Sequence, residues 1–360
     1  MTDSTDALLD ATTALVPALL STLEALGYVG RHLHPPELPA LVEAVAGLEA
    51  PLAAAHATFE AADWPEGLAT FRDQVIASSS AARQALEGLA RSVDDPNGVM
   101  RAYRAMRHST RAVEALYPLA QALPPVSRFF LDPARRMDEA LLARLDEADP
   151  SREDVGILHA QNERDTRGGV SVYVPEYYDA ARRWPLVVAL HGGSGHGRDF
   201  LWTWLREART YGCILLAPTS AGETWSLMEP GVDVPRLAER IGRVMAHWSI
   251  DPDRVLLTGM SDGGTMSLLT GLLAEGPWTH LAPISGSFHP LLMDGARDIR
   301  GLPIYLVHGA LDWMFPVAMA RTAQEALTAA GAAVHCREIE DLSHTYPRDE
   351  NPRILDWFLP

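Results

Sequence analysis

The chain has 360 residues and a formal charge of −17, and all 30 of its basic residues are arginine. Without lysine it cannot form a pyridoxal-phosphate Schiff base, a Walker-type phosphate loop or a Ser–Lys catalytic dyad. Its acidic balance also argues against general binding to nucleic acid or to an anionic membrane surface.

The length is sufficient for two globular domains. No basic segment precedes Arg31, and no apolar run approaches the roughly 18 residues that a membrane-spanning helix needs. Cys213 and Cys336 lie in apolar, strand-like segments, which favours free thiols over a disulfide. We therefore expect a cytoplasmic protein without a membrane span.

Residues 1–150 have the pattern of amphipathic helices. Apolar side chains recur at steps of three and four over 41–52, 68–89 and 99–116. Pro17 should kink or restart a first helix, and Asp132 with Pro133 predicts the start of a helix over 133–147. Four or five such helices with short connections indicate an antiparallel bundle, which forms an N-terminal helical domain.

Two roles are open for this domain. It is expected to act as a lid over the catalytic domain, as a dimerisation surface that makes a homodimer possible, or as both. The alternative is a separately folded, stabilising domain. Four arginines form a stripe on the helix over 99–116, and such a stripe is more often a solvated face than a binding site: Arg101, Arg104, Arg107 and Arg111.

After a linker at 149–154, strands and helices alternate, which defines a second domain over residues 151–360. The segments 155–160 and 170–174 are predicted to pair as a hairpin. Short apolar strands then alternate with helices such as 234–248 and 262–273. These strands are expected at 186–190, 214–217, 255–258, 281–284, 304–307 and 334–339. The pattern favours an α/β fold, a mostly parallel sheet with helices on both faces.

The strongest motif lies between a predicted strand and a predicted helix. Residues 259–263 read Gly-Met-Ser-Asp-Gly, which matches G-x-S-x-G. In that context a sharp turn raises the Ser261 hydroxyl above the sheet edge, and flanking glycines allow close backbone approach. Ser261 is therefore the candidate nucleophile.

A nucleophilic serine needs a base and an orienting carboxylate, which follow it in the chain order Ser, acid, His. Asp312 and His344 each come just after a predicted strand, so both are expected at the same sheet edge as Ser261. Asp341 is the alternative acid, and His308 is expected to be structural. His289 comes before the acid in the chain. The histidines show no metal-ligand spacing, so no metal site is predicted.

The oxyanion hole needs two backbone N–H donors. Asp262, directly after the nucleophile, should supply one, and Gly193 in the glycine-rich loop after the 186–190 strand should supply the other. An apolar acyl or aryl pocket is expected near the catalytic loops. Its candidate lining residues are Trp225, Phe288, Trp313 and Met314.

Together these segments resemble the α/β-hydrolase superfamily, most closely bacterial phospholipase/carboxylesterase and polyhydroxybutyrate-depolymerase-like serine esterases. The resemblance rests on the ordered motifs at 190–193, 251–255, 259–264, 308–312 with Pro316, and 343–344. It implies an α/β-hydrolase fold and hydrolysis of small-molecule esters through an acyl-enzyme, without a cofactor. The first 150 residues have no counterpart in the minimal fold. Thioester or amide hydrolysis, and a non-catalytic binding scaffold, remain alternatives.

Overall fold

The computed structural model describes residues 2–359, so Met1 and Pro360, the outermost residues of the two expected domains, lie outside the described residues. The chain divides into two compact units, Met1–Arg136 and Met137–Pro360. The division precedes the expected boundary at residue 150. Helix α7 (Glu139–Asp146) lies in the second unit, where the Arg144 guanidinium stacks 4.7 Å from the centre of the Tyr177 ring.

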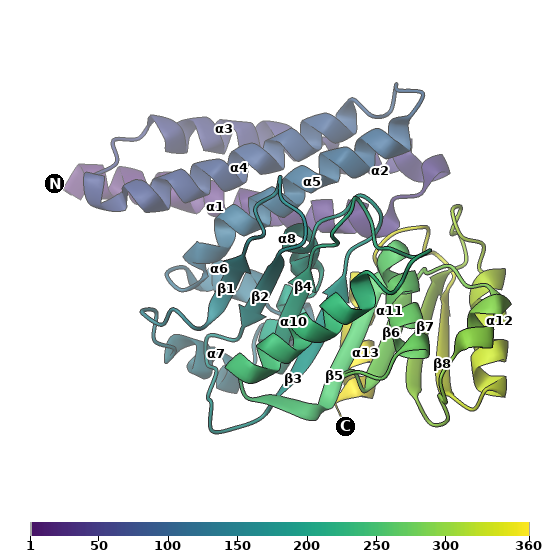
Figure 1. Cartoon of the computed structure of the whole chain (residues 1–360). Coiled ribbons are helices and arrows are strands. Elements are labelled where there is room, and N and C mark those ends of the chain that lie inside the picture. Colours follow the sequence, from purple (N-terminus) through teal and green to yellow (C-terminus); the bar gives the residue numbers. More distant parts are fainter. Residues whose placement is uncertain (1, 360) are drawn as a thin grey trace. The chain divides into compact units, whose positions relative to one another are not determined.

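The regular elements of the first unit, over its described length, are all helices (Figure 1). Gly47 separates two helices where the 41–52 pattern predicted one, and α7 is shorter than the helix expected over 133–147. The helices of this unit are α1 (Thr2–His32), α2 (Leu38–Ala46), α3 (Glu49–Ala61), α4 (Ala69–Ala90), α5 (Gly98–Leu116) and α6 (Pro124–Phe129).

Close packing of α4 against α5 depends on small residues. A Cβ atom on Gly88 would come within 2.7 Å of the Ala105 Cβ, so these two helix backbones approach closely. Of the larger apolar residues expected to face the core of α5, Leu116 is fully buried, whereas Val99, Tyr103, Met106 and Val113 are only partly buried. Three of its alanines are buried: Ala102, Ala105 and Ala112. The arginine stripe of α5 is exposed, as a solvated face would be.

Helix α1 continues through Pro17, so the expected restart there is wrong. Proline removes one backbone hydrogen bond, but the buried Leu15 and Leu19 on either side hold the helix in the bundle. By length and composition, Thr5–His32 could cross a membrane, contrary to the expectation that no segment could. Helices α2 and α3 are long and apolar enough to span a membrane only if the bent pair is counted as a single span. A core helix of a bundle also passes it, and Leu15, Leu19 and Leu26 are fully buried.

The second unit contains an eight-stranded sheet in the order β1-β2-β4-β3-β5-β6-β7-β8. The β1–β2 hairpin is antiparallel, β2 pairs antiparallel with β4, and every other pair is parallel. The strands are β1 (Gly156–Ala160), β2 (Val170–Val174), β3 (Trp184–Leu190), β4 (Ile214–Pro218), β5 (Ile250–Met260), β6 (His280–Ile284), β7 (Pro303–Gly309) and β8 (Ala333–Ile339).

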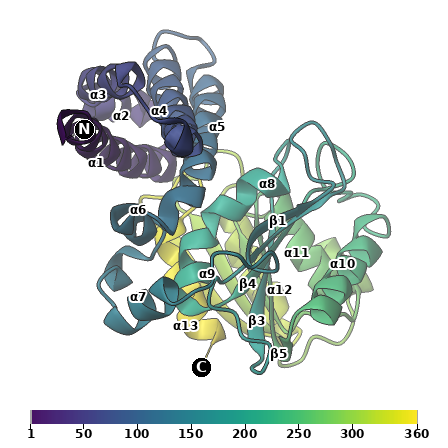
Figure 2. The ribbon, with the colours of Figure 1, turned by 90° about the vertical axis from the view of Figure 1, so that its left-hand side faces the viewer.

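Helices cover both faces of this sheet, which confirms the predicted α/β-hydrolase fold preceded by a helical region. Figure 2 shows α9 and α13 on one face and α10, α11 and α12 on the other. Central strands β3 and β4 are buried along their whole length, as a doubly covered sheet requires. The helices are α8 (Gly197–Phe200), α9 (Leu205–Tyr211), α10 (Asp233–His247), α11 (Asp262–Leu273), α12 (Ala318–Ala329) and α13 (Asn351–Phe358).

Candidate active site

Ser261 occupies the turn between β5 and α11 in a strained conformation, with φ 57° and ψ −121°. Such a backbone costs about 1–3 kcal/mol and persists only where its surroundings enforce it. A side chain on Gly263 would overlap the carbonyl oxygen of Leu190, and one on Gly259 would overlap the Gly263 backbone. The two glycines of the motif therefore let the turn fit tightly against the end of β3.

The structure brings Ser261, His344 and Asp312 into one hydrogen-bonded chain. His344 Nδ1 lies 2.8 Å from Asp312 Oδ2, and its Nε2 lies 3.0 Å from Ser261 Oγ. With the proton on Nδ1, the ring donates to the carboxylate and Nε2 accepts from the serine hydroxyl. His344 can then take the serine proton. Asp341, the alternative acid, is exposed.

Asp312 is buried and well supplied with hydrogen-bond donors. Its Oδ1 accepts from the N–H groups of Met314 at 3.0 Å and Phe315 at 2.8 Å. Burial raises the pKa of Asp312, but the bonds from His344 and the Phe315 N–H outweigh it, so the pKa lies below its usual value. His308 Nε2 donates to the Phe315 carbonyl at 2.8 Å and lies 3.5 Å from Asp312 Oδ2. The carboxylate is thus held ionised towards His344.

The two N–H groups predicted as oxyanion donors belong to Asp262, directly after Ser261, and to Gly193, in the loop after β3. Among residues 2–359, the N–H groups of Gly193 and Asp262 have no hydrogen-bond partner, which leaves both available to an oxyanion. A Cβ atom on Gly192 would lie 3.5 Å from the Ser261 Cβ, so this loop passes directly beside Ser261. The Asp262 carboxylate accepts from the Thr224 hydroxyl at 2.5 Å.

His191 organises the loop that carries Gly193. Its Nδ1 donates to the Gly192 carbonyl at 2.7 Å, and its Nε2 accepts from the Ser220 N–H at 3.1 Å. Burial lowers the pKa of His191 to about 4, so the ring stays neutral and keeps this donor–acceptor arrangement. The sequence places His191 in the glycine-rich loop but does not indicate these contacts.

Trp225 supports His191 rather than offering an open surface to a substrate. Its indole N–H donates to the His191 carbonyl at 2.7 Å, and the two rings lie 4.9 Å apart. Only 2% of Trp225 is exposed. A tryptophan with a buried N–H needs an acceptor. Here the acceptor is the His191 carbonyl, in the loop over 191–197 that carries Gly193 and is called the oxyanion loop below. The prediction of Trp225 as an open pocket wall is therefore corrected to a supporting role.

Arg167, which sequence analysis did not single out, joins the oxyanion loop to the loop over 219–225. Its guanidinium donates to the carbonyls of Gly195 at 2.7 Å, Gly222 at 2.8 Å and Glu223 at 3.1 Å, and also to the Ser220 hydroxyl. These partners lie 28 to 56 residues away in the chain. No local sequence signal marks such contacts, because every residue carries a carbonyl group.

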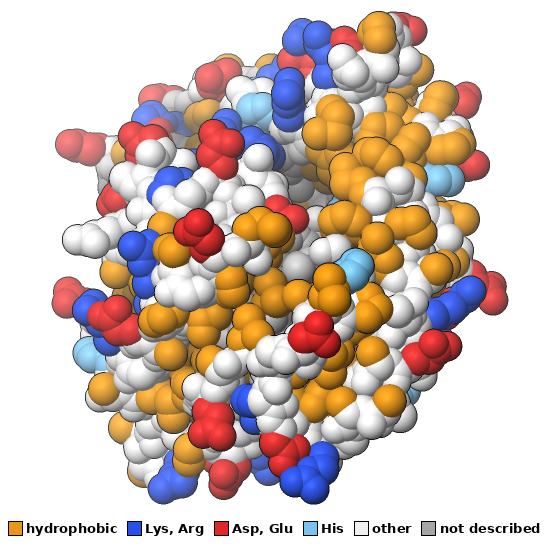
Figure 3. Space-filling model, turned by 45° about the vertical axis from the view of Figure 1, so that its right-hand side comes forward, with side chains coloured by type: hydrophobic (Ala, Val, Ile, Leu, Met, Phe, Trp, Pro, Cys, Tyr) orange, Lys and Arg blue, Asp and Glu red, His pale blue; other side chains and the backbone are white. Residues whose placement is uncertain are grey.

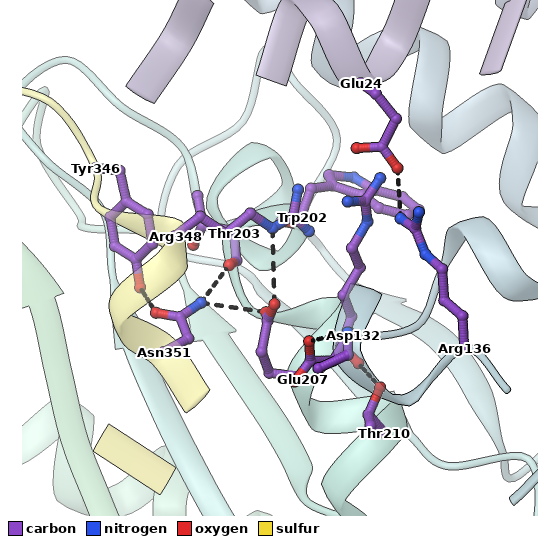
Figure 4. Close-up of polar contacts among 12 residues, drawn as sticks. Glu24, Asp132, Arg136, Trp202, Thr203, Glu207, Thr210, Tyr346, Arg348 and Asn351 are labelled. Carbon is purple, nitrogen blue, oxygen red and sulfur yellow. Dashed lines mark hydrogen bonds and ion pairs between the residues drawn. The ribbon is translucent and has the colours of Figure 1, made fainter. Parts of the chain in front are cut away.

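The loop after His344 is anchored by a buried polar network (Figure 4). The Asn351 amide donates to the Thr203 carbonyl at 2.8 Å and to Glu207 at 3.2 Å, and it accepts from the Tyr346 hydroxyl at 2.8 Å. Arg348 donates to the Trp202 carbonyl at 2.9 Å. The network ties the segment that follows His344 to α9 and the turn before it.

Of the other predicted pocket residues, Phe288 is buried beside a cavity of about 20 Å³, too small for a substrate. Trp313 and Met314 are 44% and 39% exposed on the loop that carries Asp312. The space-filling view shows apolar side chains gathered in patches between charged ones (Figure 3). Within residues 2–359, no group of three or more His, Cys, Asp or Glu side chains is placed to hold a metal ion.

Residues 234–357 match the phospholipase/carboxylesterase family. A search of curated proteins found no match. Among solved structures, the chain is similar to a thermostable esterase at 22% identity, with a TM-score of 0.45 over 57% of this chain and 62% of that one, under two thirds of its length. It is also similar to esterase PE8, at 22% identity and a TM-score of 0.44 over 57% and 100%.

A third similar structure is the esterase Est2 of the planctomycete Thermogutta terrifontis, at 14% identity and a TM-score of 0.47 over 59% of this chain and 96% of that one. The strand order and the family match, taken together, define the second unit. Residues 137–360 have an α/β-hydrolase fold, and residues 234–357 within them match the phospholipase/carboxylesterase family.

Proposed function

We propose that this protein is a serine hydrolase of carboxylic esters, with Ser261 as nucleophile, His344 as general base and Asp312 as the orienting acid. The observation that carries the proposal is the position of His344, 2.8 Å from the Asp312 carboxylate and 3.0 Å from the Ser261 hydroxyl. Nucleophile, base and orienting group within hydrogen-bond reach are the geometric signature of covalent acyl transfer.

In the acylation step, Ser261 Oγ attacks the ester carbonyl carbon while its proton passes to His344 Nε2. The carbonyl π electrons move to oxygen, and this oxyanion accepts hydrogen bonds from the N–H groups of Gly193 and Asp262. Collapse of the tetrahedral intermediate breaks the bond to the leaving oxygen, which takes the proton from His344. The products are an alcohol and an acyl-enzyme.

Water then attacks the acyl carbonyl, and His344 again accepts the proton. The second tetrahedral intermediate collapses to a carboxylic acid, and the proton returns to Ser261. Asp312 stays ionised throughout, because its pKa lies below the usual value, and it stabilises the imidazolium that forms in each step. No cofactor takes part in this scheme.

The substrate is proposed to be an ester with a small or medium apolar acyl or aryl group. Support comes from the accessible apolar side chains beside Asp312, since Leu311, Trp313 and Met314 are each about two fifths exposed. Exposed apolar groups next to reactive ones favour an apolar ligand. We expect p-nitrophenyl butyrate and octanoate to be hydrolysed with a higher kcat/KM than the palmitate ester.

The test is Ser261→Ala. Activity on p-nitrophenyl butyrate should fall by about 10⁴-fold or more, because no other group can form the acyl-enzyme. A fluorophosphonate should label the wild-type protein on Ser261, forming a phosphorus–oxygen bond as fluoride leaves. Ser151→Ala is the matched control, since Ser151 is exposed and its hydroxyl donates to Asp149, away from the candidate triad. Full activity or unchanged labelling in folded Ser261→Ala would refute the proposal.

The same triad can cleave thioesters and amides, so the assay includes p-nitrophenyl, thioester and anilide substrates of one acyl group. A higher kcat/KM for the thioester would assign a thioesterase, and for the anilide an amidase. A folded protein that neither hydrolyses any of them nor reacts with the fluorophosphonate would be a binding scaffold. The possible homodimer through the N-terminal helices is tested separately, by the solution mass of the full chain.

A further inference from the structure

A second cavity lies within the α/β unit between the β1–β2 hairpin and the C-terminal half of α10. Its volume is about 380 Å³, which falls within the range of about 300–1,000 Å³ for small-molecule sites. Buried apolar side chains form its floor, namely Val172, Leu216 and Val244. It is lined by none of Ser261, His344 or Asp312. This space is called the α10 cavity below.

The α10 cavity is basic in a protein of strongly acidic composition. Arg240, Arg243 and His247 follow one another at steps of three and four on α10, so they share one face of the helix. His159 of β1 lies on the opposing wall. No Asp or Glu is among the lining residues, although the chain carries 47 of them. The lining therefore favours an anion over a cation.

Arg240 is the central cation of this cavity. It is partly buried, and it donates to the carbonyls of Thr219, at 3.3 Å, and Gly168. Burial lowers the pKa of Arg240, and the carboxylates of Asp233 and Glu239 counter this from outside ion-pair distance. Within the described residues, no Asp or Glu carboxylate lies within 4 Å of the Arg240 guanidinium. A partly desolvated cation with only dipolar partners gains from an added negative charge.

Arg243 stands at the rim. Its guanidinium lies 2.6 Å from Glu239 Oε1, but both side chains are largely exposed. An exposed ion pair of this kind contributes at most about 1 kcal/mol, so Arg243 can turn towards a ligand at little cost. Trp248, which also lines the cavity, adds an aromatic surface beside the apolar floor.

We propose that the α10 cavity binds a small amphipathic monocarboxylate, with its carboxylate on Arg240 and Arg243 and its apolar body on Val172, Leu216 and Val244. A single charge matches the one partly buried guanidinium better than a phosphate dianion does. The planar guanidinium also suits a carboxylate through two parallel hydrogen bonds.

The probe is octanoate, titrated calorimetrically into the full-length protein. Arg240→Met removes the charge while keeping an unbranched apolar side chain, and it should weaken octanoate binding by about tenfold or more. Arg236→Met is the matched control, because Arg236 is an exposed arginine of the same helix that does not line the cavity. Its affinity should equal that of the wild type.

A second variant approaches from the other wall. Ala160→Phe fills the cavity from β1 without altering any arginine, and it should abolish octanoate binding while circular dichroism shows an unchanged fold. Neutral octanamide should bind the wild type far more weakly than octanoate. Equal binding of octanoate by wild type, Arg240→Met and Ala160→Phe would overturn the proposal, as would equal affinity for octanamide or absence of binding to the wild type.

Discussion

The two units of this chain place their polar groups differently. In Met1–Arg136, buried hydroxyls mostly bond carbonyls within one turn of their own helix, as Thr22 does with Ala18 and Ser79 with Val75. In Met137–Pro360, buried polar side chains join segments far apart in sequence, such as His344 and Ser261, which are 83 residues apart. The first pattern satisfies each buried hydroxyl within its own helix. The second assembles a site.

Backbone strain follows the same division. Among the described residues, the non-glycine residues with positive φ all lie in the second unit: Gln161, Ser194, Ser261 and Ser285. Two of them directly concern the candidate site, because Ser261 is the proposed nucleophile and Ser194 follows Gly193. Strain of this kind must be enforced by surrounding contacts, which the helical unit does not need. The strained backbone and the long-range polar contacts therefore both lie in the unit that carries the candidate site.

The largest expected effect tests the long-range contacts of the second unit. Asp312→Asn should lower kcat/KM for p-nitrophenyl butyrate by roughly 10³–10⁴-fold, because an amide holds the His344 ring in the wrong tautomer. Asp341→Asn is the matched control, since Asp341 is the exposed alternative acid. If the control loses as much activity as Asp312→Asn, or Asp312→Asn retains full activity, the assignment of the acid is wrong.

A smaller effect concerns His191 and pH. Its pKa is about 4 in the folded protein, against 6.5 ordinarily, so the folded state holds the ring neutral. The contribution is present above pH 6.5 and is lost as the pH falls towards 4, because the unfolded chain takes up the proton first. We expect the unfolding free energy to decrease by up to about 3 kcal/mol through this group.

Urea unfolding followed by tryptophan fluorescence measures this, because eight of the nine tryptophans lie in residues 137–360. His191→Gln removes the titration, so its stability should vary less with pH between 7 and 4 than that of the wild type. Parallel pH dependences for the two proteins would exclude His191 as the cause.

The smallest expected effect tests the close packing of α4 against α5 in the helical unit. Gly88→Ala should destabilise it by about 1–3 kcal/mol, because the new methyl group would come within 2.7 Å of the Ala105 Cβ and force α4 and α5 apart. Gly27→Ala is the matched control in α1, where nothing lies within 4 Å of the added Cβ. It should stabilise the unit by about 0.5–1 kcal/mol.

Thermal unfolding followed by circular dichroism measures both substitutions. Equal changes in Tm for Gly88→Ala and Gly27→Ala would show that close helix contact at Gly88 does not limit the stability of this unit.

Much of the fold could be predicted from the sequence, because periodicity and turn chemistry act over short distances. The strands and helices of residues 151–360 occur close to where they were expected, and the fold class is confirmed. The boundary between the two units was harder to predict from the sequence. Asp132 and Pro133 predicted a long helix, but Asp138 accepts from the Leu141 N–H and begins α7 later. Only tertiary contact, such as Arg144 with Tyr177, assigns α7 to the second unit.

The candidate triad could be proposed from sequence since G-x-S-x-G and the ends of parallel strands are local signals that the fold must bring to one edge. The side chains that hold the loops at that edge in place could not be predicted from the sequence. Trp225 was expected to face a substrate, and Arg167 gave no signal at all. Their partners are backbone carbonyls of distant loops, whose positions exist only once the sheet has formed.

The sequence by itself determined most of the elements and their order, the candidate nucleophile and the exclusion of lysine chemistry, because these depend on residue identity and short-range spacing. The tertiary structure alone decided where the units divide, which side chains hold the oxyanion loop, and that a basic cavity lies beside α10. Those features depend on which distant backbone segments meet, and long-range packing determines that outcome.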